Sequence, residues 1–126
     1  MKLRFGIIGC GRIAPRHADS LAEIPEAELV MVCDVIENRA HHFAEKHGVK
    51  YCLDYHELLA NPDIDIVNIC TPSGMHASMA IDALRAGKHV IVEKPMAMSV
   101  SDADRMIATA KEVDRKLCII LQNRYN

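Results

Sequence analysis

The sequence has no tryptophan, few aromatic residues and no marked excess of either charge. Aromatic residues make up 4% of the 126 positions, and 15 Lys and Arg against 17 Asp and Glu give a formal net charge of −2. Nucleic-acid binding needs a basic surface or aromatic stacking platforms, so we expect no nucleic-acid partner. No apolar run approaches the roughly 20 residues of a membrane span, and the amino-terminal stretch is a poor signal peptide. These absences predict a cytoplasmic protein without membrane contact.

The cysteine content argues against a disulfide framework. The chain has 5 cysteines, an odd number, and Cys33, Cys70 and Cys118 lie inside apolar runs. We therefore expect buried, reduced thiols. Because 50% of the residues are hydrophobic, a chain of this length can form one domain around a single core.

Apolar runs and amphipathic stretches alternate from end to end. Continuous Val- and Ile-rich runs are typical of parallel strands that are covered on both faces. Helical spacing of apolar residues begins at Ala14, Ala40, Ala77 and Ala103, and Asp54 starts a shorter helix. The predicted strands are Leu3–Ile8, Leu29–Cys33, Lys50–Cys52, Ile66–Cys70, His89–Val92 and Leu117–Leu121.

This alternation with short connections predicts an α/β fold with a doubly wound parallel sheet. About six strands in the order 3-2-1-4-5-6 make it a Rossmann fold. Ligands of such sheets bind where the carboxyl ends of the strands meet. Any single polar strand end can be an ordinary turn, but here every long run ends in such a residue. The strand-end residues are Gly9, Asp34, Thr71, Glu93 with Lys94, and Gln122.

The first strand leads directly into a G-x-G-x-x-A sequence that opens a helix. Gly9 permits a tight turn, Gly11 lets a pyrophosphate approach the backbone, and Ala14 lets the helix pack close to the strand. The phosphates are expected on the backbone N–H groups of Arg12 and Ile13, at the positive end of the helix dipole. Two glycines in a loop can also be only a turn, but the strand and helix that flank them favour a dinucleotide site.

Asp34 ends the second strand about 20 residues after Ala14, the spacing of the acid that binds the adenosine ribose hydroxyls. Its carboxylate repels a 2′-phosphate, so the sequence favours NAD over NADP as cofactor. The alternative for Asp34 is an exposed turn residue. Arg39 either stacks on the adenine or lies on a solvated helix face.

Two further segments follow later strands. The loop Thr71–Gly74 contains Pro72 and Ser73 and precedes His76, and we expect it near the nicotinamide, with a surface position as the alternative for His76. Lys94 follows Glu93 at the next strand end. Beside a positively charged nicotinamide its pKa falls, so that it can exchange a proton with a substrate hydroxyl. Glu93 then holds or tunes Lys94, and a surface ion pair is the competing explanation.

The glycine turn, Asp34, the segment Cys70–His76 and the Glu93–Pro95 sequence together resemble the Gfo/Idh/MocA oxidoreductase family. The resemblance covers essentially the whole chain. It implies a nicotinamide-dependent dehydrogenase or reductase that acts on a sugar, cyclitol or nucleotide-sugar. It also implies that Lys94 is the catalytic lysine.

The same resemblance assigns further roles. Thr71, Ser73 and His76 match cofactor-contacting positions, although asparagine is common in the family where Ser73 stands. Gln122 and Arg124 match the crossover strand, where an arginine often faces the nicotinamide or the substrate. The resemblance thus implies an NAD(P)-binding domain at residues 1–121, with residues 122–126 starting the crossover to a substrate domain that this chain lacks.

Three expectations follow for the chain as it stands. It should bind coenzyme with little turnover, and the alternative is a non-catalytic NAD(P)-binding or regulatory module. The last strand can leave an exposed sheet edge, which favours a homo-oligomer. His41, His42 and His47 have no coherent ligand partners, so a solvated helix face is expected there and no metal site.

Overall fold

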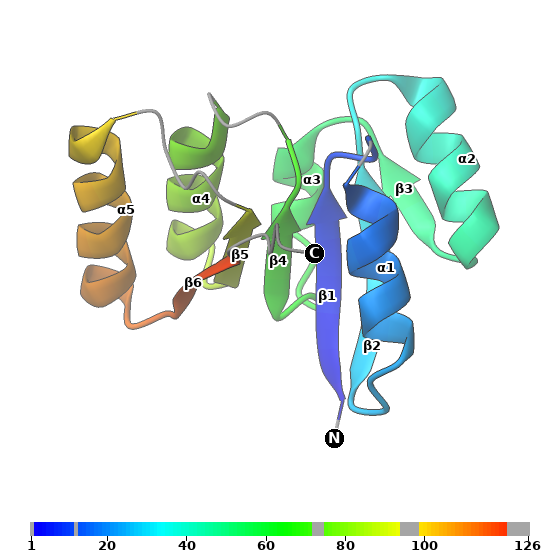
Figure 1. Cartoon of the computed structure of the whole chain (residues 1–126), viewed down its shortest axis with the longest axis horizontal. Helices are drawn as coiled ribbons and strands as arrows, with labels where there is room; N and C mark the ends of the chain where they lie inside the picture. Colours follow the sequence, from blue (N-terminus) through cyan, green and yellow to red (C-terminus); the bar gives the residue numbers. More distant parts are fainter. Residues whose placement is uncertain (1, 12, 72–74, 94–98, 121–126) are drawn as a thin grey trace, which may run out of the picture.

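A computed structural model describes residues 2–11, 13–71, 75–93 and 99–120. Six strands form one parallel sheet in the order β3-β2-β1-β4-β5-β6, which confirms the predicted fold class (Figure 1). The strands are β1 (Leu3–Ile8), β2 (Ala27–Cys33), β3 (Lys50–Cys52), β4 (Ile66–Ile69), β5 (His89–Glu93) and β6 (Leu117–Ile120). The helices are α1 (Ala14–Ala22), α2 (Glu37–His47), α3 (Tyr55–Leu59), α4 (His76–Arg85) and α5 (Val100–Val113).

The helices cover the two faces of the sheet unequally. Neighbouring strand residues point to opposite faces, so Ile7 packs with α1 and α2 while Ile8 packs with the other three helices. Ile7 and Ile8 are 0% and 2% exposed, respectively, because helices lie over both faces of β1. The right-handed connections explain this division, since the chain leaves β1 in one direction and β4 in the other.

Beyond β4, the described helices cover only one face of the sheet well. Val90 and Val92 are buried under α4 and α5, whereas Ile91 between them is half-buried. Cys118 on β6 is exposed, so the expectation of a buried thiol is wrong at this position. Leu117 packs toward the helices, and alternation turns Cys118 to the opposite face. The other four cysteines are buried thiols, as expected.

Local signals in the sequence explain most helix ends. Ser99 caps α5 by accepting a hydrogen bond from the Asp102 amide at 3.1 Å, and Asp54 caps α3 through the His56 amide at 2.9 Å. Gly48 ends α2 in the left-handed conformation. In β2 the strand begins at Ala27, two positions before the predicted Leu29, because its first residues pair with the start of β1.

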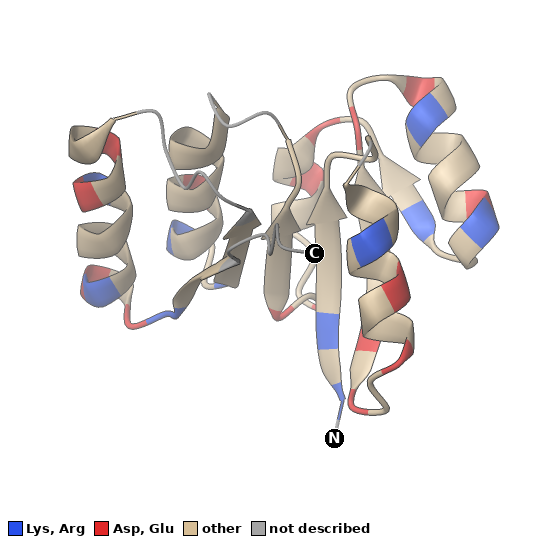
Figure 2. Cartoon of the chain, viewed as in Figure 1, with Lys and Arg blue, Asp and Glu red and all other residues tan. Residues whose placement is uncertain are grey.

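Charged side chains lie mainly on helices and connecting loops, with both signs interspersed in the view of Figure 2. Among the described residues, no helix combines the length and the apolar character needed to cross a membrane.

Candidate functional site

The ends of β1, β2 and β4 meet around one cavity of about 290 Å³ at the carboxyl edge of the sheet. Gly9, Asp34 and Thr71 line it, one from each strand end. The sheet order places β1 between β2 and β4, so this is where the strand order reverses. Residues predicted to converge from three separate segments therefore do converge.

Gly9 makes the turn that the glycine motif predicts. Its φ is +99°, a conformation that other residues rarely adopt, and its N–H donates to the Cys33 carbonyl at 2.7 Å. A Cβ atom at Gly9 would lie 3.0 Å from the Cys70 backbone. Backbone geometry and space thus both require glycine here.

Asp34 is fixed by the chain around it. One carboxylate oxygen accepts the Cys10 N–H at 2.8 Å, and the other accepts the Ile36 N–H at 2.9 Å. Asp34 is half-buried and lines the cavity. Because each carboxylate oxygen keeps a second acceptor site, the side chain is positioned to accept further hydrogen bonds from a ligand.

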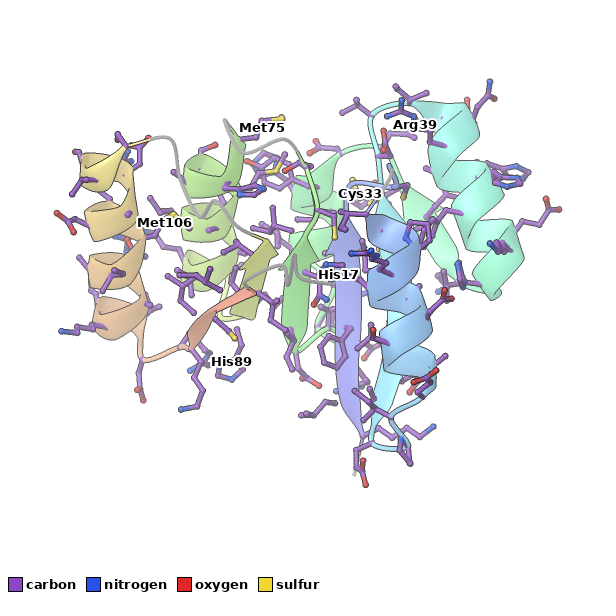
Figure 3. The ribbon with its side chains drawn as sticks, in the orientation of Figure 1. His17, Cys33, Arg39, Met75, His89 and Met106 are labelled. Atoms are coloured by element: carbon purple, nitrogen blue, oxygen red, sulfur yellow. The ribbon has the colours of Figure 1, made fainter. Side chains whose placement is uncertain are left out.

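The second glycine faces open space. A Cβ at Gly11 would meet a single described atom, Nη1 of Arg39, at 4.0 Å. Arg39 is exposed and also lines the cavity, so its side chain lies beside the cleft (Figure 3). Ile13 is the N-cap of α1 and Ala14, fully buried, is its first residue. The predicted phosphate donor Arg12 lies outside the described residues.

One wall of the cavity is apolar, and the sequence analysis missed it. Figure 3 shows Met75, Cys33 and Arg39 at the same end of the molecule. Val35 is 79% exposed, although it comes only two residues after the buried end of β2. In the sequence, the signal that could have revealed this wall is the apolar pair Val35 and Ile36 directly after the strand-end residue Asp34. The apolar lining comprises Ile8, Val35, Ile36, Leu53, Met75 and Met79.

The structure decides against the surface alternative for His76. It is the first residue of α4 and only 2% exposed, so a surface position is wrong. It is not among the residues that line the 290 Å³ cavity. Its Nε2 lies 2.7 Å from the Thr71 carbonyl oxygen, while the Thr71 hydroxyl donates to the Met79 sulfur at 3.4 Å. His76 therefore orients the Thr71 backbone.

The remaining predicted site residues are only partly placed. Glu93 ends β5 at the same edge of the sheet. The other predicted positions lie outside the described residues: Pro72, Ser73, Lys94, Gln122 and Arg124.

Tyr55 closes the far side of the cavity. Its hydroxyl donates to Asp82 at 2.5 Å. Burial, together with this hydrogen bond and the negative charge of Asp82, raises the pKa of Tyr55 to about 12. The phenol consequently stays neutral at physiological pH and tethers the start of α3 to α4.

A larger cavity of about 780 Å³ lies elsewhere, between α5 and the start of β6. His89 and Leu117, the first residues of their strands, place it at the opposite edge of the sheet. None of the predicted site residues is among the residues that line it. Within the described ranges, no three His, Cys, Asp or Glu side chains are grouped as metal ligands.

A glycine turn before a helix, an acid at the end of β2 and a cavity at the switch point define a dinucleotide-binding α/β domain. The sequence matches the model of the oxidoreductase family with an NAD-binding Rossmann fold over residues 3–120. The chain belongs to this family, Gfo/Idh/MocA.

Curated relatives support the assignment. The chain is 41% identical to the myo-inositol 2-dehydrogenase of Thermotoga maritima over 113 residues, covering 89% of this chain and 34% of that protein. It is 36% identical to the inositol 2-dehydrogenase of Salmonella typhimurium, covering 100% of this chain and 39% of the relative. The chain thus spans little more than a third of the length of these dehydrogenases.

Solved structures are similarly close. The WlbA dehydrogenase from Chromobacterium violaceum, solved with NADH and UDP-GlcNAcA, superposes with a TM-score of 0.92 at 37% identity. The match covers 94% of this chain and 35% of that one. The 3-ketoreductase KijD10 from Actinomadura kijaniata, solved with NADP and TDP-benzene, gives 0.90 at 35% identity, covering 94% and 37%. Both nicotinamide dinucleotides therefore occur among the similar structures.

Proposed function

We propose that this chain binds NAD(H), with the adenosine half in the 290 Å³ cavity and Asp34 on the ribose hydroxyls. The observation that carries the proposal is the joint position of Gly9, Asp34 and Thr71 around that cavity. Ligand pockets usually measure about 300–1,000 Å³, so this one suits a nucleoside better than a whole dinucleotide. The apolar wall from Val35 to Met79 offers the surface that an adenine ring needs.

The pyrophosphate has a separate place in this proposal. Gly11 leaves space beside the start of α1, where the helix dipole and free backbone N–H groups favour an anion. Arg39 lies next to this space and adds a positive charge.

NAD is favoured over NADP because of the Asp34 charge. Its carboxylate is held by two backbone N–H groups and cannot easily turn away from a 2′-phosphate. Repulsion at close range, together with lost ribose hydrogen bonds, lowers affinity for NADP.

In the longer protein we infer a dehydrogenase or reductase acting on a sugar, cyclitol or nucleotide-sugar. Bound nicotinamide supplies the hydride acceptor or donor. Lys94 exchanges a proton at the reacting oxygen of the substrate, and Glu93 holds Lys94 or adjusts its pKa. Thr71 and Ser73 lie on the nicotinamide side of the coenzyme. His76 contributes to that side by positioning the Thr71 backbone.

The domain assignment is part of the same proposal. Residues 1–121 form the coenzyme domain, and residues 122–126, including Gln122 and Arg124, lead to a substrate domain. Pro72 belongs to the loop facing the nicotinamide. Alone, the chain binds coenzyme with little turnover, because positioning the substrate supplies much of the rate. The edge strand β6 (Leu117–Ile120) is a surface for homo-oligomer formation.

The test is calorimetric titration of the chain with NADH and NADPH. We expect NADH to bind more tightly. Asp34→Ser should lower NADH affinity about tenfold, equivalent to about 1.4 kcal/mol, and should narrow the difference between the two coenzymes. The matched control is Asp104→Ser, which removes an exposed carboxylate from α5. Equal NADH affinity for both variants would remove Asp34 from the ribose site, and no binding by the unmodified chain would refute the function itself.

A further inference from the structure

Two buried cysteines lie side by side beneath the cavity. Cys33 on β2 and Cys52 on β3 are register partners, 2% and 4% exposed, and their thiols are hydrogen-bonded to each other. Neighbouring strands lie about 4.8 Å apart, within the Cα separation of about 4.4–6.8 Å that disulfides span. Since β3 is a three-residue edge strand, it has room for the small shift that a covalent bond between the sulfurs requires.

The backbone of both cysteines supports the proposed coenzyme site. The Cys33 carbonyl accepts the Gly9 N–H at 2.7 Å and the Cys10 thiol at 3.5 Å. The Cys52 carbonyl accepts the Asp34 N–H at 3.2 Å. Cys33 also lines the cavity. Any change in the separation of these cysteines is therefore transmitted to the glycine turn and to Asp34.

The two thiols differ in acidity. The hydrogen bond from the Cys33 thiol lowers the pKa of Cys52, whereas the same bond and burial raise the pKa of Cys33. Of the two thiols, Cys52 therefore loses its proton more readily, and its S–H lies 3.4 Å from the Asp54 carbonyl oxygen, to which it donates when protonated. Burial and the nearby Asp34 raise the pKa of Cys10 to about 12, so this third thiol stays protonated and does not compete as a nucleophile.

We propose that Cys33 and Cys52 form an oxidation site at which hydrogen peroxide makes a disulfide, and that this disulfide and bound NAD(H) oppose each other. The second half of this inference rests on the proposed function. Thiol pairs of this kind are reversible modification sites, because a reductant returns them to the free form.

The chemistry is balanced with peroxide as the only oxidant. The Cys52 thiolate attacks one peroxide oxygen, the O–O bond breaks, and the leaving hydroxide takes the Cys33 proton to become water. The Cys33 thiolate then attacks the Cys52 sulfenic acid sulfur, the S–O bond breaks, and hydroxide leaves with a solvent proton as a second water. Two thiols lose two electrons, and one peroxide is reduced to two waters.

Coupling to the coenzyme follows from the same contacts. A disulfide draws the sulfurs to about 2.05 Å, which moves the two carbonyls that hold Gly9 and Asp34. Conversely, a coenzyme in the cavity covers Cys33 and fixes Asp34. Such coupling is reciprocal at equilibrium, so coenzyme must disfavour the disulfide if the disulfide weakens coenzyme binding. Because bound coenzyme also covers Cys33, which lines the cavity, we expect it to slow the oxidation.

The experiment treats the reduced chain with hydrogen peroxide, with and without saturating NADH. Peptide mapping by mass spectrometry under non-reducing conditions identifies the linked cysteines, and fluorescence titration gives NADH affinity before oxidation, after it, and after dithiothreitol. We expect a Cys33–Cys52 link, slower linking with NADH present, and at least a tenfold loss of NADH affinity that dithiothreitol restores. Cys118→Ser, at an exposed thiol, should behave like the unmodified chain. For Cys52→Ser, NADH affinity should not respond to peroxide.

Each contrary result has a distinct meaning. If peroxide oxidises Cys118 but leaves Cys33 and Cys52 unlinked, the oxidation site is refuted. If the link forms and NADH affinity stays constant, the opposition between disulfide and coenzyme is refuted. If the reduced chain binds no NADH, the proposed function fails, and peptide mapping alone then decides the oxidation site.

Discussion

The two halves of the sheet differ in how completely the described helices cover their faces. On the β1–β3 side, helices cover both faces, and the strand ends carry a cavity with a fixed carboxylate. On the β5–β6 side, α4 and α5 cover one face, while Ile91 is half-buried and Cys118 exposed on the other. The first half supplies Gly9 and Asp34 to the cavity that we propose for the adenosine, and Met75 and Met79 at the start of α4 complete its apolar wall.

If this cavity binds the adenosine, changes to the residues that form it should alter NADH affinity, whereas changes elsewhere in the chain should mainly alter stability. The following substitutions test this division in order of expected effect.

The largest effect is expected from Gly9→Ala. The substitution places a side chain at φ +99° and 3.0 Å from the Cys70 backbone, which should cost about 3 kcal/mol or more and abolish measurable NADH binding. Gly48→Ala is the matched control, since its φ is +68° but nothing lies within 4 Å. It should cost about 1–2 kcal/mol and leave affinity unchanged. Urea denaturation and NADH titration measure both; equal losses of affinity would contradict the account.

The next effect concerns a buried contact between α1 and β4. The Asn68 amide on β4 donates to Nδ1 of His17 on α1 at 2.8 Å, and both residues are buried. His17→Ala leaves this amide without its His17 partner, so we expect a loss of about 2–3 kcal/mol in the free energy of unfolding, with little change in NADH affinity. His42→Ala removes an exposed histidine and should change stability by less than about 0.5 kcal/mol. A His17→Ala variant as stable as the control would show that the contact contributes nothing.

Lys88 provides a pH-dependent test at the far end of β5. Its ammonium donates to the Asn61 and Ile64 carbonyls, and burial lowers its pKa below 10.5. Lys88→Met removes the ammonium donor from both carbonyls, although the Asn61 carbonyl keeps the Ile64 N–H at 3.2 Å. We expect the loss to cost about 1–3 kcal/mol. Between the lowered pKa and 10.5 the unfolded chain binds more protons than the folded one, so the unmodified protein gains stability relative to the variant as pH rises. Denaturation series at pH 8 and pH 10 test the sign, and a shrinking difference would contradict it.

The smallest effect is expected at the surface. Arg85 and Glu112 form an ion pair at 3.1 Å between α4 and α5, but both side chains are more than half exposed. Arg85→Ala should reduce stability by less than about 1 kcal/mol and leave NADH affinity unchanged. Thermal denaturation at low and high salt measures it; a large, salt-insensitive loss would mean that this pair matters more than its exposure implies.

The sequence predicted the backbone of the site better than its side-chain surroundings. Buried parallel strands appear as continuous apolar runs and helices have a clear hydrophobic period. The alternation of the two patterns therefore predicted the sheet and the position of Gly9 and Asp34 at neighbouring strand ends. Glycine at positive φ and an acid at a strand end are also requirements of the local chain. These are the features that a single sequence expresses directly.

Contacts between distant segments were not predictable in the same way. The His17–Asn68 pair joins residues 51 positions apart, and the only hint was a polar residue within the apolar strand β4. His76 is buried with its Nε2 against the Thr71 carbonyl oxygen, and no periodicity of the sequence predicts such a contact. Cys118 was expected to be buried because an apolar run does not reveal that only one face of its strand is covered.

The most direct test of the account is to map NADH on the folded chain by backbone NMR. We predict that NADH shifts the amide resonances of Gly9, Cys10, Gly11 and Asp34 strongly, while those of β6 and the 780 Å³ cavity remain in place. Shifts concentrated around Leu117 and Arg115, with the glycine turn unaffected, would contradict the central claim.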